Sequence, residues 1–247
     1  MPIQNPEIVA KINQTYRVNF LKDVALARLL DEQTFSALTS IAFLNQAEIV
    51  TFIQSDPKFL DQLFSILSEE KLSLKRRKDV VLFLHELSSI VKGMHPHGKS
   101  EFFRSLAQHG LFAIFEYTLG DHDTDIRIAV ISILTNILDG ESSLVRSFCL
   151  AQSKQGQKTL SEFLVDKFLT EPDSGLRSQL SDILRMLLDT FKLDATEGLV
   201  HQSSEAEEFL TLFYESALSK LVSPILELDK GLLTDEQGNF IKSFAGV

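Results

Sequence analysis

The feature that most constrains the fold is an amphipathic segment that recurs 50 residues further along the chain. DTDIRIAVISILTNILD occupies residues 123–139, and DSGLRSQLSDILRMLLD occupies residues 173–189. Apolar residues of the clearer copy recur every three or four positions, which marks one face of an α-helix. They are Ile126, Ala129, Val130, Ile133, Leu134, Ile137 and Leu138. A repeated apolar face needs repeated neighbours to cover it, so the pattern predicts a stack of similar helical units.

A weaker third copy, KRRKDVVLFLHEL, lies 50 residues before the clearer one. Long helices are therefore predicted near residues 74–92, 123–139 and 173–191. Shorter helices are predicted between and before them, at Thr34–Leu44, Ala47–Gln54, Pro57–Leu67, Ser100–Gln108, Leu111–Leu119, Ser142–Ala151 and Thr159–Leu169. A unit of three helices in about 50 residues is closer to armadillo packing than to the two-helix HEAT form. We expect an all-α, armadillo/HEAT-like helical solenoid that forms a single domain over residues 1–247.

The C-terminal part of the chain is organised less regularly. Lys192–Ser204 is predicted to be a polar loop, and Ala206–Leu221 a helix with Pro224 soon after it. Asp235–Val247 begins a new amphipathic pattern that then stops. Because terminal repeats normally carry a polar cap, this ending predicts a central fragment of a longer chain.

Composition agrees with helices and argues against several kinds of partner. Only 11 glycines and 6 prolines occur among 247 residues. The formal net charge of −10 disfavours general binding of nucleic acid or anionic lipid. A single cysteine excludes an internal disulfide framework and fits a reducing compartment. No apolar stretch approaches the ~20 residues that cross a bilayer, so we expect neither membrane contact nor direct nucleic-acid binding.

No motif predicts catalysis, a metal site or a cofactor. The cluster Asp121–Asp125 opens like a calcium loop, but that loop needs glycine sixth and glutamate twelfth, where Ile126 and Ser132 stand. His95 and His97 lack the further ligands of a zinc site. The sequence has no glycine-rich phosphate loop and no G-x-S-x-G or H-E-x-x-H motif. We therefore expect a binding protein and not an enzyme.

Positive side chains on the predicted long helices are the candidate binding residues. Stacked three-helix units present their long helices on the concave side, where a polar stripe forms a groove for an acidic partner surface. The candidates are Lys75, Arg76, Lys78, Arg127, Asn136, Arg177 and Arg185. A structural interpretation is also open, because Arg127 and Arg177 follow Asp123 and Asp173 by four positions, the spacing of a helical ion pair. The basic run at 75–78 is more simply explained as a solvated loop end.

Several long blocks of the chain resemble one family. They include YRVNFLKDVALARLL, FFRSLAQHGLFAIFEYTL, IRIAVISILTNIL, GLRSQLSDILRMLLD and FLTLFYESALSKLVSPIL. These blocks are similar to the suppressor-of-MEK (Smek) domain of protein phosphatase 4 regulatory subunit 3, and the resemblance covers residues 16–226.

The resemblance implies a non-catalytic, armadillo-like scaffold without a cofactor. It implies a phosphatase holoenzyme with a metal-dependent serine/threonine catalytic subunit and regulatory subunit 2 as partners, and protein substrates. It also implies a role in DNA-damage signalling and a location in nucleus and cytoplasm. The alternative is a generic armadillo-type peptide-binding adaptor. Such adaptors line a groove with repeated asparagines and tryptophans, whereas this chain has no tryptophan and only Asn136 on a repeated long helix.

Overall fold

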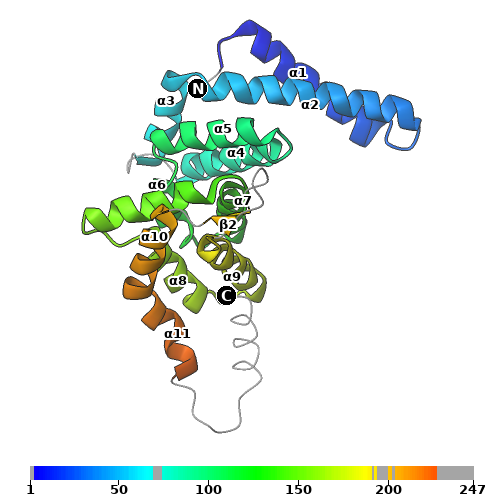
Figure 1. Ribbon diagram of the computed structural model, residues 1–247. Coiled ribbons are helices and arrows are strands. Elements are labelled where there is room, and N and C mark those ends of the chain that lie inside the picture. Colours follow the sequence, from blue (N-terminus) through cyan, green and yellow to red (C-terminus); the bar gives the residue numbers. More distant parts are fainter. Residues whose placement is uncertain (1–2, 69–73, 191, 194–199, 202–203, 227–247) are drawn as a thin grey trace. The chain divides into compact units, whose positions relative to one another are not determined.

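The computed structural model (Figure 1) describes residues 3–68, 74–190, 192–193, 200–201 and 204–226. The chain divides into two compact units, residues 1–111 and 112–247. Each unit is considered by itself, and the single-domain array over residues 1–247 stays a prediction. The described residues are almost entirely helical, so the all-α prediction is confirmed.

Unit 1 is built on the long helix α2 (Glu32–Gln54), which contacts every other helix of the unit. Helix α1 (Pro6–Phe20) packs along α2, with Gln14 accepting a hydrogen bond from the Asn45 side chain at 3.1 Å. The π-helical turn η1 (Leu21–Ala25) follows α1. The remaining helices are α3 (Pro57–Ser68), α4 (Leu74–Lys92) and α5 (Pro96–Gln108). The predicted long helix at 74–92 is thereby confirmed.

Two predictions for unit 1 need correction. Helix α1 was not predicted, although Asn5 caps it by accepting from Glu7 N and Ile8 N, and Pro6 occupies its first turn. The predicted helices Thr34–Leu44 and Ala47–Gln54 form one continuous helix. The polar residue between them, Asn45, does not end the helix because its side chain is buried and bonded to α1.

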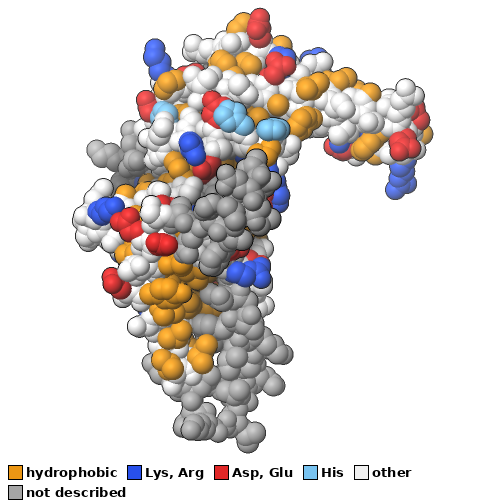
Figure 2. Space-filling view, viewed as in Figure 1, with side chains coloured by type: hydrophobic (Ala, Val, Ile, Leu, Met, Phe, Trp, Pro, Cys, Tyr) orange, Lys and Arg blue, Asp and Glu red, His pale blue; other side chains and the backbone are white. Residues whose placement is uncertain are grey.

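Much of the surface of α1, η1 and the first half of α2 is apolar. Exposed large hydrophobic residues in this region are Val9, Ile12, Tyr16, Phe20, Leu21, Val24, Leu29, Phe35, Ile41, Phe43 and Leu44. Figure 2 shows hydrophobic side chains along the α2 helix on the face that it presents. By length and composition, α2 and also α7 could cross a bilayer, so the expectation that no stretch is long enough was wrong. The absence of membrane contact stays a prediction.

Unit 2 is organised around α7 (Thr124–Lys154), which packs against α9 (Ser174–Leu188) and α10 (Ser204–Ser216). Helix α7 is bent at Glu141, whose φ of −152° and ψ of 62° are not helical. This bend lies where the sequence predicted one helix to end and the next to begin, at 139 and Ser142. The other helices are α6 (Ala113–Thr118) and α8 (Leu160–Thr170). Thr159 and Glu162 form a capping box at the start of α8.

The 50-residue register is confirmed within unit 2. Ile133 and Leu134 of α7 and Ile183 and Leu184 of α9 are all at most 1% exposed. The predicted helices at 123–139 and 173–191 correspond to the first part of α7 and to α9. The repeat therefore marks two helices that occupy equivalent buried places.

The end of unit 2 differs from the predicted single helix Ala206–Leu221. Helix α10 ends at Ser216, and after a bend of 46° a separate helix α11 covers Leu218–Leu226. Pro224 lies inside α11, where it cannot donate to the Lys220 carbonyl. The Ser223 hydroxyl donates to that carbonyl at 3.0 Å, which restores the missing bond. Figure 2 shows hydrophobic side chains over this part of the unit.

The predicted polar loop Lys192–Ser204 contains a short strand pair that the sequence did not predict. Strand β1 (Lys192–Leu193) and strand β2 (Val200–His201) pair antiparallel, with Lys192 opposite His201. The amphipathic pattern predicted within Asp235–Val247 lies outside the described residues.

Candidate functional site

The starts of α7 and α9 carry the candidate arginines, and both helices begin with the same cap. Asp123 is the N-cap of α7 and accepts from Asp125 N at 3.1 Å. Asp173 is the N-cap of α9 and accepts from Leu176 N at 2.9 Å. The aspartates that the sequence analysis paired with arginines are therefore capping residues that fix the first turn of each helix.

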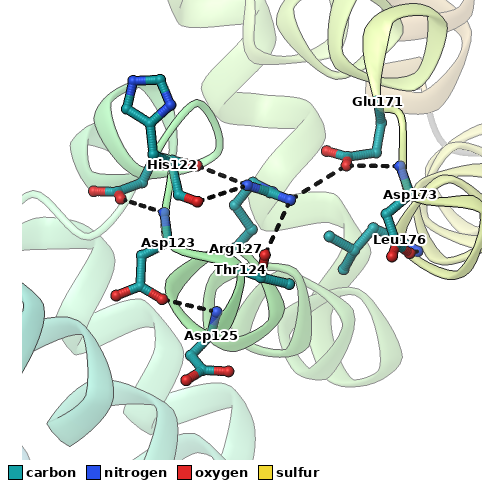
Figure 3. A network of polar contacts seen from close by, with 9 residues as sticks. His122, Asp123, Thr124, Asp125, Arg127, Glu171, Asp173 and Leu176 are labelled. Carbon is teal, nitrogen blue, oxygen red and sulfur yellow. Dashed lines mark hydrogen bonds and ion pairs between the residues drawn. The ribbon is translucent and has the colours of Figure 1, made fainter.

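An acidic residue stands two positions before each cap and binds the cap residue itself. Asp121 Oδ1 accepts from Asp123 N at 2.8 Å, and Glu171 Oε1 accepts from Asp173 N at 3.2 Å (Figure 3). Asp121 and Glu171 are themselves 50 residues apart, so the repeat extends further upstream than the apolar pattern indicated.

Arg127 is held in a network at the junction of the two helix starts (Figure 3). Its Nη1 donates to the Asp121 carbonyl at 2.9 Å, and its Nη2 lies 3.4 Å from Glu171 Oε1. The Arg127 side chain is only 15% exposed and that of Glu171 only 6%. This geometry supports the structural interpretation of Arg127 as a tie between repeats, with Glu171 as its carboxylate partner.

The other candidates on these helices differ in accessibility. Asn136 of α7 is buried, so its predicted place on an exposed polar stripe was wrong. Arg177 is half-buried. Arg185 is exposed and pairs with Asp182 at 2.7 Å, one turn away on the same helix. Exposed positive charge on α9 is thus partly balanced by its own helix.

The remaining candidates lie at the start of α4 in unit 1. Lys75 and Arg76 are exposed and Lys78 is half-buried. No acidic residue stands in the first turn of α4. This end of α4 is therefore strongly positive, since the helix dipole adds to the lysine and arginine charges. Whether this run and the α9 arginines form one binding rim stays a prediction.

The cysteine and histidine side chains that could suggest catalysis or metal binding have structural roles. No group of three or more histidine, cysteine or acidic residues among the described positions could hold a metal ion. Cys149 is buried, and burial raises the pKa of its thiol to about 11. The His95 ring caps α5, with Nδ1 accepting from His97 N at 3.4 Å. Cys149 is therefore a core residue, and His95 belongs to a helix start.

Two charged clusters of unit 2 were missed by sequence reasoning. Arg146 is 1% exposed and binds Glu205 of α10 at 3.2 Å and Ser142 at 3.2 Å. Asp166 of α8 lies between Lys158 and Lys220. Spacing along the sequence could have suggested the Ser142–Arg146 contact, which spans one helical turn. Glu205 and Lys220 lie 59 and 54 residues from their partners, so no local pattern pointed to these pairs.

Comparison with known proteins identifies the family. The model of a family described as phosphatase 4 regulatory subunit 3 matches residues 1–240. The chain is 33% identical over 224 residues to Suppressor of Mek1 of Dictyostelium discoideum, covering 91% of this chain and 20% of that protein. It is 30% identical over 233 residues to serine/threonine-protein phosphatase 4 regulatory subunit 3 of Drosophila melanogaster, covering 92% and 23%.

A Schizosaccharomyces pombe protein described as uncharacterized is 30% identical over 249 residues, which are 93% of this chain and 30% of that protein. The chain thus spans less than a third of the length of these relatives. No solved structure matches it. Because the family model covers nearly the whole chain, the chain belongs to the phosphatase 4 regulatory subunit 3 family.

Proposed function

We propose that the chain is a non-catalytic scaffold part of a phosphatase 4 regulatory subunit. In this role it binds the serine/threonine phosphatase catalytic subunit, directs that subunit to protein substrates, or does both. The observation that carries the proposal is the family match over residues 1–240. Holding enzyme and substrate on one scaffold raises the local substrate concentration, which increases turnover without any catalytic group in the scaffold.

The helical structure is compatible with this role. Helices α7 and α9 share aspartate N-caps and the buried pairs Ile133–Leu134 and Ile183–Leu184, as neighbouring units of an armadillo-like solenoid would. The solenoid itself, like regulatory subunit 2 as a further partner, belongs to the proposal. So do the nuclear and cytoplasmic location and the role in the DNA-damage response. The alternative, a peptide-binding adaptor, gains nothing from Asn136, because that side chain is buried.

A pull-down tests the proposal directly. The purified chain, immobilised by a terminal tag, is mixed with purified phosphatase 4 catalytic subunit, with and without regulatory subunit 2. We expect retention of the catalytic subunit that is lost when the chain is heat-unfolded. The catalytic subunit of a different phosphatase is the specificity control. Equal retention of both phosphatases, or of neither in the presence of regulatory subunit 2, would contradict the proposal.

A further inference from the structure

Three lysines of unit 2 gather around one aromatic ring and one carboxylate. Lys158 precedes α8, Lys167 lies on α8, and Lys220 lies on α11. The Lys158 and Lys167 ammonium groups lie 5.7 Å and 5.4 Å from the centre of the Phe163 ring. Asp166 binds Lys158 at 2.5 Å and also binds Lys220. We call Lys158, Lys167 and Lys220 the lysine cluster.

The cluster carries more positive charge than its surroundings neutralise. Among the described residues, the Lys158 and Lys220 ammonium groups share Asp166 as their carboxylate partner, whereas Lys167 contacts the Phe163 ring. Burial alone would raise the pKa of Asp166, but hydrogen bonds and charge from Lys158 and Lys220 outweigh it and lower that pKa. The nearby Glu162 carboxylate is engaged in capping α8 through Thr159. Counting Asp166 and Glu162 against the three lysines, one positive charge remains on a chain whose net charge is −10.

The lysines are placed to receive a ligand. The side chains of Lys158 and Lys220 are 53% and 57% exposed, although both hold Asp166. The Phe163 ring attracts both the Lys158 and the Lys167 ammonium groups, which restricts each side chain before any ligand arrives. Fixing these flexible side chains in advance lowers the entropy cost of binding an anion.

The chemistry of the cluster selects one class of ligand. Lysine ammonium groups act as point charges that bind carboxylates in many orientations. Base stacking on Phe163 is disfavoured, because two ammonium groups occupy its surroundings. A surface with three lysines also has fewer basic residues than the four to eight typical of anionic-lipid binding. We propose that the lysine cluster is a docking surface for an acidic, carboxylate-rich segment of a partner protein.

A charge-neutralising variant tests the cluster. The probe is a fluorescein-labelled Glu-Gly repeat peptide, with the Gln-Gly repeat as neutral control, and binding is measured by anisotropy at low and high salt. Replacing Lys158, Lys167 and Lys220 by Gln should weaken binding about tenfold, since each exposed ion pair contributes a modest share. The matched control replaces Lys58, Lys92 and Lys99, which lie in unit 1, by Gln and should change the affinity less than about twofold.

For a second variant we expect the opposite effect, a higher affinity for the acidic peptide. Asp166 competes with an incoming carboxylate for Lys158 and Lys220, so Asp166→Asn should strengthen peptide binding about twofold to threefold. Asp139→Asn, an exposed position on α7, gives the same change in net charge and should have no comparable effect. If the lysines only stabilise the fold, Asp166→Asn should lower the melting temperature without improving binding.

Three outcomes would overturn the proposal. One is equal weakening by the cluster variant and the control variant, which would indicate net charge alone. Another is unchanged or weaker binding by Asp166→Asn while circular dichroism shows an intact fold. The third is binding of the chain to vesicles of phosphatidylserine and phosphatidylcholine, with loss in the cluster variant but no binding of the acidic peptide. That result would assign the surface to a membrane.

Discussion

Helices α2 and α7 are both long and apolar, but they bury very different shares of their side chains. The buried residues of α2 are Ala42, Asn45, Val50 and Ile53, and none precedes Ala42. Helix α7 has fourteen buried residues, distributed from Ile126 to Gln152. In α7 the apolar residues recur on the faces that α9 and α10 cover, whereas the first half of α2 also has apolar residues on exposed faces. Apolar content alone thus does not indicate burial, because the neighbours decide it.

The largest expected difference between the two helical regions is the cost of removing a leucine side chain. Leu184→Ala in α9 should lower the free energy of unfolding by about 2–5 kcal/mol, through lost burial and the cavity left behind. Leu44→Ala in α2, where the side chain is 60% exposed, should change it by less than about 0.5 kcal/mol. Urea unfolding followed by circular dichroism measures both. Similar losses would show that the α2 leucine is covered in solution.

Breaking an ion pair should give a smaller difference in unfolding free energy between unit 2 and unit 1. Arg146→Ala leaves Glu205 without its buried partner and should cost about 3 kcal/mol. Lys11→Ala breaks the exposed pair with Glu48 between α1 and α2, at 2.7 Å, and should cost at most about 1 kcal/mol. The same unfolding experiment applies, with Arg146→Met as a control that keeps the volume. A loss below 1 kcal/mol for Arg146→Ala would mean that Glu205 finds water or another donor.

Thiol labelling compares how readily each region opens. Cys149 is the single cysteine of the chain and is buried in α7, so its labelling reports on unit 2. The variant Ala42→Cys with Cys149→Ser places a buried thiol in α2 instead. At neutral pH we expect about tenfold slower labelling of Cys149, since α2 has fewer buried contacts to break on opening. Labelling at equal rates would indicate that both units open together.

The same thiol predicts a pH dependence. Folding raises the pKa of Cys149 from 9.0 to about 11, so the folded state favours the neutral thiol. The stabilisation is fully present below pH 9 and is lost as the pH rises from 9 towards 11. Cys149→Ser should therefore lose less stability than the parent chain over that interval. Thermal melts at pH 8 and pH 10.5 measure the difference, and identical losses would contradict the assignment.

The smallest effects on stability are expected for the basic candidate residues, whose reversal tests partner binding. Reversing Arg177 and Arg185 to Glu should weaken binding of the phosphatase catalytic subunit and reduce its salt dependence, while helicity and melting temperature stay nearly unchanged. Reversing Lys75, Arg76 and Lys78 to Glu tests the corresponding surface of unit 1. Normal binding by the first variant across a salt titration would assign Arg177 and Arg185 a purely structural role.

The extent to which the structure could be predicted follows the range of the interactions. The apolar spacing of α7 and α9 reflects contacts along one helix face, so their burial was predictable from the sequence. The Asn45–Gln14 bond between α1 and α2 joins residues 31 positions apart, so no local signal pointed to it. Arginine spacing predicted that Arg127 would form an ion pair. Its partner Glu171 lies 44 positions away, so the spacing pointed to a nearer carboxylate.

Glu171 also has a consequence for cooperativity. Its carboxylate is nearly inaccessible to water, and it accepts from the cap residue of α9 while contacting the arginine that anchors the start of α7. Fraying of either helix start would leave a buried oxygen of this carboxylate without a hydrogen-bond donor, which costs free energy. The two helix starts are therefore expected to melt as one unit. In a repeated architecture such a shared residue acts as a nearest-neighbour coupling, so that order in one repeat favours order in the next.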